Sequence, residues 1–486
     1  MSDDKYSKYE VIVGLEVHAQ LSTHSKMYSG DSAEFGASPN THVSVISLGH
    51  PGTLPMVNKT AIEYAVKIGL ATHCDIRHEN QFARKNYFYA DLPKGYQITQ
   101  DKTPICTGGY LEFEVNGEMK KVRLTRIHME EDAGKSIHDI DPYFTLVDLN
   151  RAGVPLIEIV SEPDIRSGDE AMAYLNEVQK LVRYLEICDG NMEEGSMRCD
   201  ANISVRLKGT TAFNPRSEVK NMNSMRNVKR AIDFEFTRQV DLIEAGEVPA
   251  QETRGFDAVK GITLSQRSKE HAHDYRYFPE PDLPPVVLTD DYIDGVKAAM
   301  PKLPNQLINE YISDYGLPAY DARIITDDKE LAGYFNELLT LTKNYKAAAN
   351  WILGPVKNYL NENGQEIRDF KIKPQKIGDL IWLIDQGKTN FSTAANKLFP
   401  ILLKFPEHDV ESLVLSENLM QLSDEEMLGE LVEQVIKKYP QKVEEYRKGK
   451  KGLLGLFVGE VMKLSKGKAD PKVTNKLVLE VLEKEG

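Results

Sequence analysis

The stretch from residue 9 to residue 21 constrains the fold more than any other part of this chain. Apolar residues fill every second position from Val11 to Ala19, and the positions between them include the polar residues Glu16 and His18. This period of two is typical of a β-strand with one buried face. Glu16 and His18 then project to the same side, one pleat apart. A carboxylate beside an imidazole forms half of a metal or acid/base site, although the strand alone leaves a solvent-facing polar edge as the alternative.

The composition is that of an ordinary globular protein. The chain has 486 residues, which is enough for roughly three domains. No apolar run is long enough to cross a bilayer. The first residues carry neither an apolar signal core nor an Arg-rich transit sequence, so we expect a cytoplasmic protein with no membrane partner. The 4 cysteines contain no CxxC pair, which indicates neither a disulfide framework nor a cysteine-rich metal site.

Charge is distributed unevenly along the chain. The net charge of -14 argues against a nucleic-acid-binding surface over the whole molecule. Residues 409–433 carry eight acidic side chains and no Lys or Arg, whereas residues 447–476 carry nine basic and two acidic side chains. Such asymmetry within one segment indicates a local binding surface for a partner.

The apolar pattern predicts an α+β fold in three parts. Strand-like alternation at 110–115, 121–130 and 199–207 is mixed with helical spacing over 167–185. Four prolines within 278–285 interrupt regular structure, and the pattern beyond them is helical. We therefore predict a large mixed sheet-and-helix domain over 1–294, an all-α domain over 295–408 and a small helical tail over 409–486.

A second group of candidate site residues lies within 127–135. If the preceding strand continues, His128, Glu130 and Asp132 share one face and Glu131 points to the other. Three consecutive carboxylates at a strand end repel one another unless a cation or basic groups neutralise them. The segment therefore predicts a neutralising partner.

Two further strands carry polar side chains on one face. One contains Asp200 and Asn202, and on the other Glu218 aligns with Lys220. Carboxylate oxygens with one imidazole and no thiolate suit Mg²⁺ or Mn²⁺ better than a structural zinc ion. Together the polar strands favour a metal-dependent site for phosphoryl transfer.

A separate cluster over 83–97 mixes cations, tyrosines and amides, among them Lys85, Tyr87 and Lys94. A surface hairpin explains this composition as well as a functional site does. The residues alone leave both interpretations open.

Six segments together resemble the B subunit of the aspartyl/glutamyl-tRNA amidotransferase. The resemblance covers essentially the whole chain, and the motifs are long and follow the family's order. They are Val-Ile-Val-Gly-Leu-Glu-Val-His (11–18), Arg-Lys-Asn-Tyr-Phe-Tyr (84–89), His-Met-Glu-Glu-Asp-Ala-Gly-Lys (128–135), Val-Asp-Leu-Asn-Arg-Ala-Gly-Val-Pro-Leu-Ile-Glu-Ile-Val (147–160), Glu-Gly-Ser-Met-Arg-Cys-Asp-Ala-Asn (194–202) and Asp-Tyr-Arg-Tyr-Phe-Pro-Glu-Pro-Asp-Leu (274–283).

The resemblance implies a heterotrimer in which two other proteins, an amidase subunit and a small third subunit, accompany a chain of this kind. In that family the B subunit uses ATP and Mg²⁺ to phosphorylate the side-chain carboxylate of Glu on tRNA(Gln) or of Asp on tRNA(Asn). Ammonia from the amidase subunit then displaces the phosphate. The first domain would be the catalytic cradle, and the tail would contact tRNA. Which of the two amidated tRNAs is formed stays open.

The family's functional residues match three sets of positions in this sequence. The resemblance implies metal ligands at Glu16, His18, Glu130 and Glu218. It implies nucleotide-binding residues at Asp200, Asn202 and Lys220. It implies catalytic residues at the mouth of an ammonia channel at Lys85, Tyr87, Lys94 and Glu131.

One departure from the family is visible. Many members carry four cysteines that bind zinc where this chain has Ser29, Asp31, Ser44 and Ser47. None of these side chains supplies a thiolate, so we predict no zinc and expect packing or hydrogen bonds to hold the loop. Two other functions stay open: a stand-alone carboxylate–amine ligase for a free metabolite, and a non-catalytic tRNA-binding scaffold.

Overall fold

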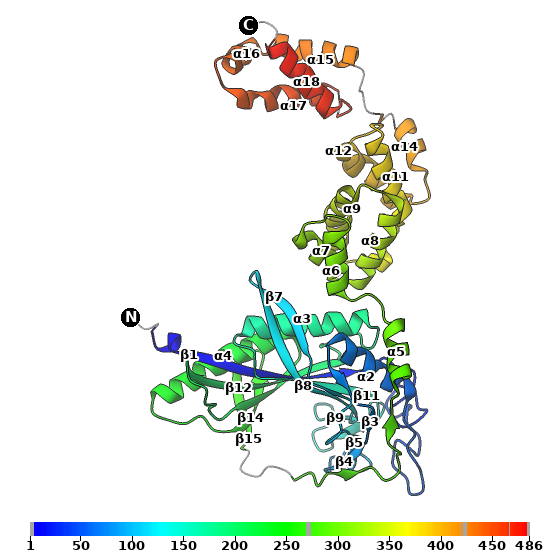
Figure 1. Ribbon diagram of the computed structural model, residues 1–486, viewed down its shortest axis with the longest axis vertical. Helices are drawn as coiled ribbons and strands as arrows, with labels where there is room; N and C mark the ends of the chain where they lie inside the picture. The colour runs from blue at the N-terminus through cyan, green and yellow to red at the C-terminus, as the bar shows by residue number, and fades with distance from the viewer. Residues whose placement is uncertain (1–3, 269–273, 418, 421–424, 466, 484–486) are drawn as a thin grey trace. The chain divides into compact units, whose positions relative to one another are not determined.

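The chain folds into two compact units, Met1–Leu303 and Pro304–Gly486. The computed structural model describes residues 4–268, 274–417, 419–420, 425–465 and 467–483 (Figure 1). The first unit contains a large sheet with helices, and the second is helical. The predicted α+β fold is therefore confirmed.

The largest sheet of the described residues has 13 strands. Its main path runs β15-β14-β13-β12-β1-β11-β8-β5-β4-β16, and three further strands pair beside it. The bounds along the path are β15 (Ile262–Ser268), β14 (Glu252–Asp257), β13 (Ser217–Met222), β12 (Met197–Leu207), β1 (Tyr9–Gln20), β11 (Pro155–Ser161), β8 (Glu118–Glu131), β5 (Tyr96–Thr99), β4 (Ala83–Asn86) and β16 (Phe278–Pro279), with β2 (Asp75–Ile76), β6 (Cys106–Thr107) and β7 (Tyr110–Val115) beside it. Two small ladders join β9 (Lys135–Ile137) to β10 (Leu146–Asp148) and β3 (Glu79–Asn80) to β17 (Val286–Val287).

Strand β1 lies in the middle of the sheet and pairs antiparallel with β11 and β12. Its alternate residues from Val11 to Ala19 are buried, whereas Glu16, His18 and Gln20 are half-buried, as the sequence predicted. The expected strands at 110–115, 121–130 and 199–207 are likewise present, as β7, part of β8 and β12.

Two long helices cover the apolar face of the sheet. They are α3 (Gly168–Tyr184), where a helix was expected, and α4 (Met225–Glu244), and Figure 1 shows them side by side. Each begins with a serine whose hydroxyl accepts a hydrogen bond from the backbone N–H three residues on, which caps the helix. Their buried residues share one core with β1 and β12. The polar residues of these strands therefore project from the opposite face.

The remaining helices of the first unit are α1 (Asp4–Ser7), α2 (Lys59–Ala71) and α5 (Asp290–Ala299). Helix α5 packs against α2, so the first unit continues past residue 294.

The second unit consists of helices joined by short connections. They are α6 (Pro304–Ser313), α7 (Ala319–Thr326), α8 (Lys329–Leu341), α9 (Tyr345–Trp351), α10 (Lys357–Asn363), α11 (Pro374–Asp385), α12 (Phe391–Thr393), α13 (Phe399–Lys404), α14 (Val410–Ser416), α15 (Glu425–Lys438), α16 (Pro440–Arg447), α17 (Leu454–Leu464) and α18 (Pro471–Glu483), with π- or 3₁₀-helical segments at Ile352–Val356, Ile367–Asp369, Ala394–Leu398 and Lys451–Leu453. Helices α15 to α18 enclose a core of their own around Val432, Phe457 and Val478. Among the described residues, none of these helices, nor any in the first unit, is long and apolar enough to cross a membrane.

Candidate functional site

The strand register brings polar side chains from five neighbouring strands into one row. Glu16 of β1 lies opposite Asp200 of β12, and His18 of β1 lies opposite Glu158 of β11. The row continues on both sides, because Glu158 is opposite His128 of β8 and Asn202 is opposite Glu218 of β13. The expected alternation on each strand and the pairing between strands together build the site.

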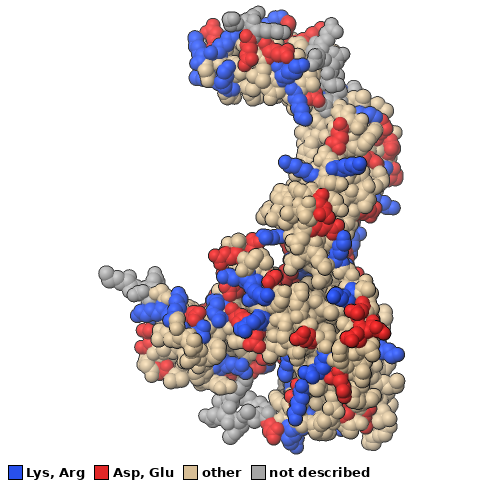
Figure 2. Space-filling model, viewed as in Figure 1, with Lys and Arg blue, Asp and Glu red and all other residues tan. Residues whose placement is uncertain are grey.

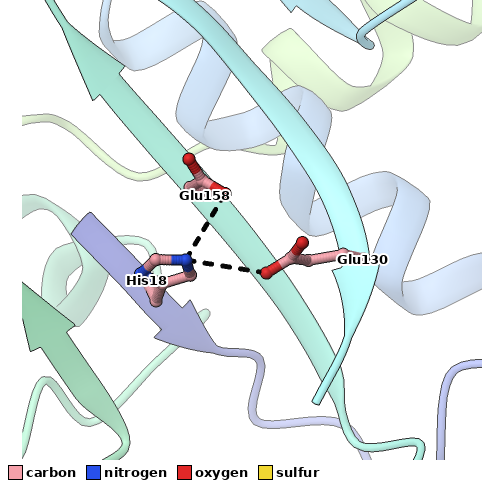
Figure 3. A group of neighbouring side chains, drawn as sticks. All are labelled: His18, Glu130 and Glu158. Carbon is pink, nitrogen blue, oxygen red and sulfur yellow. Dashed lines mark ion pairs between the residues drawn. The ribbon is translucent and has the colours of Figure 1, made fainter. Parts of the chain in front are cut away.

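Three side chains at one end of the row form a first acidic cluster, His18, Glu130 and Glu158 (Figure 3). The Nε2 atom of His18 lies 3.4 Å from Glu158 Oε2 and 3.7 Å from Glu130 Oε1. His128 Nε2 is also close, at 3.3 Å from Glu158 Oε2. One ligand atom from each of the three residues lies within 4.8 Å of the others, a spacing that suits a divalent cation.

The charges of this cluster shift its pKa values. Burial alone would lower the pKa of His18, but the carboxylates of Glu158 and Glu130 raise it. The same competition raises the pKa of His128 to about 9. Burial would raise the pKa of Glu158, but hydrogen bonds from the two imidazoles hold it well below its usual range. Without a metal ion, the carboxylates of this cluster therefore favour the protonated form of both imidazoles.

A second acidic cluster contains Glu16, Asp200 and Glu218. Lys220 Nζ lies 2.7 Å from Asp200 Oδ2 and 3.1 Å from Glu218 Oε1, and these carboxylates hold the pKa of Lys220 above its usual value despite its burial. Asn202 donates its amide N–H to Glu16 Oε1 at 2.8 Å. Burial, with the neighbouring carboxylates of Glu158 and Asp200, raises the pKa of Glu16. A second cation fits here by the same criterion of ligand spacing.

The four residues expected to be metal ligands therefore fall into two clusters. His18 and Glu130 belong to the first cluster, and Glu16 and Glu218 belong to the second. Asp200, expected near the nucleotide, shares the second cluster. The sequence analysis missed Glu158, although a lone glutamate within the apolar strand Pro155–Ser161 is a signal that could have identified it.

The first cluster and Asp200 of the second cluster line one polar cavity of about 700 Å³, whereas Glu16 and Asn202 line a different one. Lys85 and Tyr87 also line the cavity of about 700 Å³, as do Arg198 and Lys220. Burial and the carboxylates of Glu130 and Glu131 raise the pKa of Tyr87, so its hydroxyl stays protonated. Cations and acidic groups thus line the same cavity, whose volume lies within the range of ligand-binding pockets.

A smaller cavity of about 240 Å³ adjoins the other face of the end of β8. Glu131 and Lys94 form a buried ion pair in its wall, and Glu131 also accepts a hydrogen bond from the backbone N–H of Ile98 at 2.9 Å. Glu130 and Glu131 therefore face different cavities, as the alternation predicted. The four expected channel residues are divided: Lys85 and Tyr87 line the large cavity, whereas Lys94 and Glu131 line the small one.

Lys26 is a further cation in the wall of the small cavity. Its side chain is almost completely buried, and its Nζ donates to the carbonyl oxygens of His42 at 2.6 Å and Leu149 at 3.3 Å. Burial lowers the pKa of Lys26 to about 8. This amine thus gives up its proton much closer to neutral pH than an exposed lysine does.

The three consecutive carboxylates at 130–132 each have a basic neighbour. Glu130 lies beside the histidines, and Glu131 pairs with Lys94. Asp132 accepts hydrogen bonds from Arg198 at 2.8 Å and from Gln20, and these partners lower its pKa although burial opposes them. Basic groups thus neutralise the three carboxylates, as expected. Arg198 is a basic partner of Asp132, and neither residue belongs to an acidic cluster.

Comparisons with known proteins identify the family. The sequence matches the GatB/GatE catalytic domain over residues 11–294 and the GatB domain over residues 333–482. A protein of Thermodesulfovibrio yellowstonii is 51% identical over 98% of this chain and 99% of its own length. Proteins of Caldicellulosiruptor bescii and Geotalea uraniireducens are 48% and 49% identical, each over 98% of this chain. All three are named as the B subunit of an aspartyl/glutamyl-tRNA(Asn/Gln) amidotransferase.

The chain belongs to this B-subunit family. The resemblance inferred from the six sequence segments is thereby confirmed. Within the family, the GatB/GatE catalytic domain includes both acidic clusters and both cavities.

In this member of the B-subunit family, the positions that we expected to lack zinc lie together in a hydrogen-bonded loop. The hydroxyl oxygens of Ser29 and Ser47 are 3.2 Å apart. The carboxylate of Asp31 accepts hydrogen bonds from the backbone N–H of Ser44 at 2.9 Å and from the Ser47 hydroxyl. These bonds cross-link the loop, and Ser29 and Ser47 also line the small cavity.

The tail that we expected to contact tRNA presents basic and acidic side chains together. Figure 2 shows them interspersed on the face of the tail that it presents. Lys448 and Lys450 pair with Glu444 and Glu445 at 3.5 and 3.1 Å, and Lys438 pairs with Glu460. Of the basic residues within 447–476, Lys466 lies outside the described residues. Basic residues of the tail are thus partly neutralised by neighbouring glutamates.

Proposed function

We propose that this chain is the tRNA-dependent catalytic subunit of a glutamine-dependent amidotransferase. It would phosphorylate the side-chain carboxylate of Glu on tRNA(Gln), of Asp on tRNA(Asn), or of both, with ATP and Mg²⁺, and then amidate it with ammonia. The observation that carries the proposal is the acidic cluster of His18, Glu130 and Glu158, which lines one polar cavity together with Asp200 of the second cluster. The names of the relatives support the tRNA substrate and the other subunits.

The chemistry balances in two steps. A carboxylate oxygen of the aminoacyl side chain attacks the γ-phosphorus of ATP, ADP leaves, and an acyl phosphate forms. Ammonia then attacks the acyl carbon, inorganic phosphate leaves, and the nitrogen loses a proton. The first step makes a leaving group from an oxygen that leaves poorly by itself. The proposed site therefore has to stabilise phosphate charge rather than perform difficult covalent chemistry.

The acidic clusters suit the cation that this reaction requires. His18, Glu130 and Glu158 would hold one Mg²⁺ or Mn²⁺, and Glu16, Asp200 and Glu218 are spaced for a second. Such ions, when bound, offset the negative charge of the phosphates. Asn202 orients Glu16 through its hydrogen bond. Lys220, which two carboxylates hold at the cavity wall, would meet a nucleotide phosphate.

The small cavity would supply the second substrate from the amidase subunit. Ammonia must reach the acyl phosphate as the neutral molecule, so a group on its route has to take up the proton of ammonium. Glu131, with its partner Lys94, is the proposed acceptor, because it borders the small cavity one residue from Glu130 in the large one. The amidase subunit would provide the ammonia and the small third subunit would hold the trimer together, while the tail would contact the body of the tRNA.

The test uses the reconstituted trimer with γ-labelled ATP and each mischarged tRNA. We expect label transfer to Glu-tRNA(Gln), Asp-tRNA(Asn) or both. Glu158→Gln should lower it about 100-fold or more, because a neutral amide binds a divalent cation poorly. Glu112→Gln, on the exposed face of β7, is the matched control and should act like the parent. Normal transfer by the Glu158 variant would contradict the metal assignment. Equal phosphorylation of free glutamate would favour the stand-alone ligase, and no phosphorylation of either would favour the scaffold.

A further inference from the structure

A row of tyrosine rings extends from the large cavity to the protein surface. Tyr87, which lines the cavity, contacts Tyr89 and Tyr275 with ring centroids 5.9 and 6.0 Å apart, and Tyr275 contacts Tyr277 at 6.1 Å. All three contacts are edge-to-face, with interplanar angles of 70 to 72°. Tyr89 is 60% and Tyr277 is 41% exposed. The outer rings of this tyrosine row therefore offer faces or edges to solvent.

One cation contacts these rings, and a second lies between two of them in the chain. Lys85 Nζ lies 5.7 Å from the ring centroid of Tyr87 and 4.9 Å from that of Tyr275. The exposed Arg276 stands between Tyr275 and Tyr277 in the chain. Alternating cations and aromatic rings are typical of surfaces that bind unpaired nucleotides, because the cations attract phosphates while the rings stack with bases.

The row is held rigidly by hydrogen bonds between its two segments. The backbone N–H of Asn86 donates to the carbonyl oxygen of Tyr275 at 3.0 Å, and the Asn86 side-chain amide donates to that of Arg276 at 2.9 Å. Strand β16, which follows Tyr277, then pairs with β4, which contains Lys85. A surface ordered in advance loses little entropy when it binds a flexible ligand.

The backbone of Arg276 adds a second sign of a functional segment. Its φ is +47°, in the left-handed region that residues other than glycine rarely adopt. Such a conformation tends to occur at binding and active sites. This turn places Tyr275 and Tyr277 on either side of the arginine in the chain.

We propose that the tyrosine row, with Lys85 and Arg276, stacks the unpaired nucleotides at the 3′ end of the charged tRNA. This inference rests on the proposed function and specifies how the substrate is bound. The amino acid is esterified to the last ribose, so the last nucleotides have to lie beside the cavity in which its side chain reacts. Tyr87 and Lys85 belong both to the row and to the cavity wall, so the row begins where this end of the substrate must lie.

The experiment places 2-aminopurine at the 3′-terminal adenine of a deacylated tRNA and titrates it with the reconstituted trimer. Stacking quenches 2-aminopurine, so we expect quenching by the parent protein. Tyr89→Ala and Tyr277→Ala should each lose most of the quenching and raise the KM for charged tRNA about 5- to 100-fold, as expected from stacking of about 1–3 kcal/mol per base. Tyr89→Phe and Tyr277→Phe keep the aromatic ring and should retain the quenching and the KM of the parent. These variants therefore show whether the alanine variants fail because stacking is lost or because the protein misfolds.

Further variants test the cations and the specificity of the effect. Arg276→Ala should reduce the dependence of tRNA binding on salt by about one unit of slope, because one phosphate contact is lost. Tyr143→Ala, which removes an exposed tyrosine outside the row, should leave quenching and KM unchanged.

Three outcomes would overturn the inference. Full quenching and normal KM in both alanine variants would show that the rings do not stack the tRNA end. If the alanine variants quench normally but fail to co-elute with the amidase subunit, the row is an interface between subunits. If the parent trimer phosphorylates Glu-tRNA but gives no quenching, the proposed function stands and the stacking of the tRNA end on the row is refuted. If the parent trimer gives quenching but no phosphorylation, the stacking on the row is supported and the proposed catalytic function is refuted.

Discussion

The two faces of the end of strand β8 show how one step along a strand changes chemistry. Glu130 faces the large cavity beside two histidines and Glu158, whereas Glu131 faces the small cavity in an ion pair with Lys94. Both glutamates are buried, and they are neighbours in sequence. Their surroundings differ because successive side chains point to opposite faces. The difference teaches that adjacent carboxylates can have entirely separate partners, which the proposed roles in cation binding and proton uptake require.

The largest expected effect comes from the large cavity. Glu130→Gln should lower ATP-dependent phosphorylation of Glu-tRNA about 1000-fold, because it removes a charged ligand that would hold the catalytic cation. The dissociation constant for tRNA should stay within about twofold. Single-turnover transfer from γ-labelled ATP measures the first quantity and filter binding the second. If the variant phosphorylates Glu-tRNA at the parent rate, Glu130 does not hold the catalytic cation as proposed.

Lys26 tests the electrostatics of the small cavity through pH. Its pKa is lowered to about 8 by burial, so the unfolded chain binds more protons than the folded one from about pH 8 to about pH 10.4. The contribution of Lys26 to stability is therefore least favourable below pH 8 and rises through that window by up to about 3 kcal/mol.

Lys26→Met removes this titration. Urea unfolding at several pH values should show the stability of the parent protein rising relative to that of the Met variant between pH 8 and 10. A constant difference would mean that the amine is better solvated than its burial indicates.

Glu131→Gln is the counterpart of the Glu130 variant. We expect glutamine-dependent amidation to fall about tenfold or more, with much smaller losses when ammonium salt is the donor at high pH, because only the proton acceptor is lost. The ratio of the two initial rates is the measurement. Phosphorylation should remain near the parent value, and equal losses with both donors would contradict a role in ammonia delivery.

The smallest expected effect concerns the loop that supports the small cavity. Asp31→Asn should lower the free energy of unfolding by about 1–2 kcal/mol, because the carboxylate accepts hydrogen bonds from Ser44 and Ser47. Burial opposes ionisation, yet these bonds lower the pKa of Asp31. Its contribution is thus present above about pH 3.9 and lost as the pH falls through the folded pKa. An unchanged unfolding midpoint at pH 7 would show that packing alone holds the loop.

The sequence predicted which residues face the same way, but not which of them meet. Alternation along β1 places Glu16 and His18 on one face, as found. Their separation into two clusters depends on register, since Glu16 pairs with Asp200 on β12 and His18 pairs with Glu158 on β11. Register between strands about 140 to 180 residues apart in sequence is set by the whole sheet and has no local signature.

Other parts of the site escaped prediction for related reasons. Glu158 lies in a strand whose other residues are mostly buried and apolar, so its pattern suggested a core rather than a site. The division of residues 83–97 between two cavities depends on how β4 and β5 meet the end of β8. The family resemblance named residues specific enough to be tested, while their grouping depends on the assembled sheet.

The central place of β1 determines what a mistake in strand register during folding would do to the site. Because β1 is hydrogen-bonded along both edges, its backbone fixes the two halves of the acidic row at once. A slip of one residue would turn apolar side chains toward the cavity and bury Glu16 and His18 in the core. Misassembled molecules would then lose both acidic clusters together, so each molecule of this protein would contain either both clusters or neither.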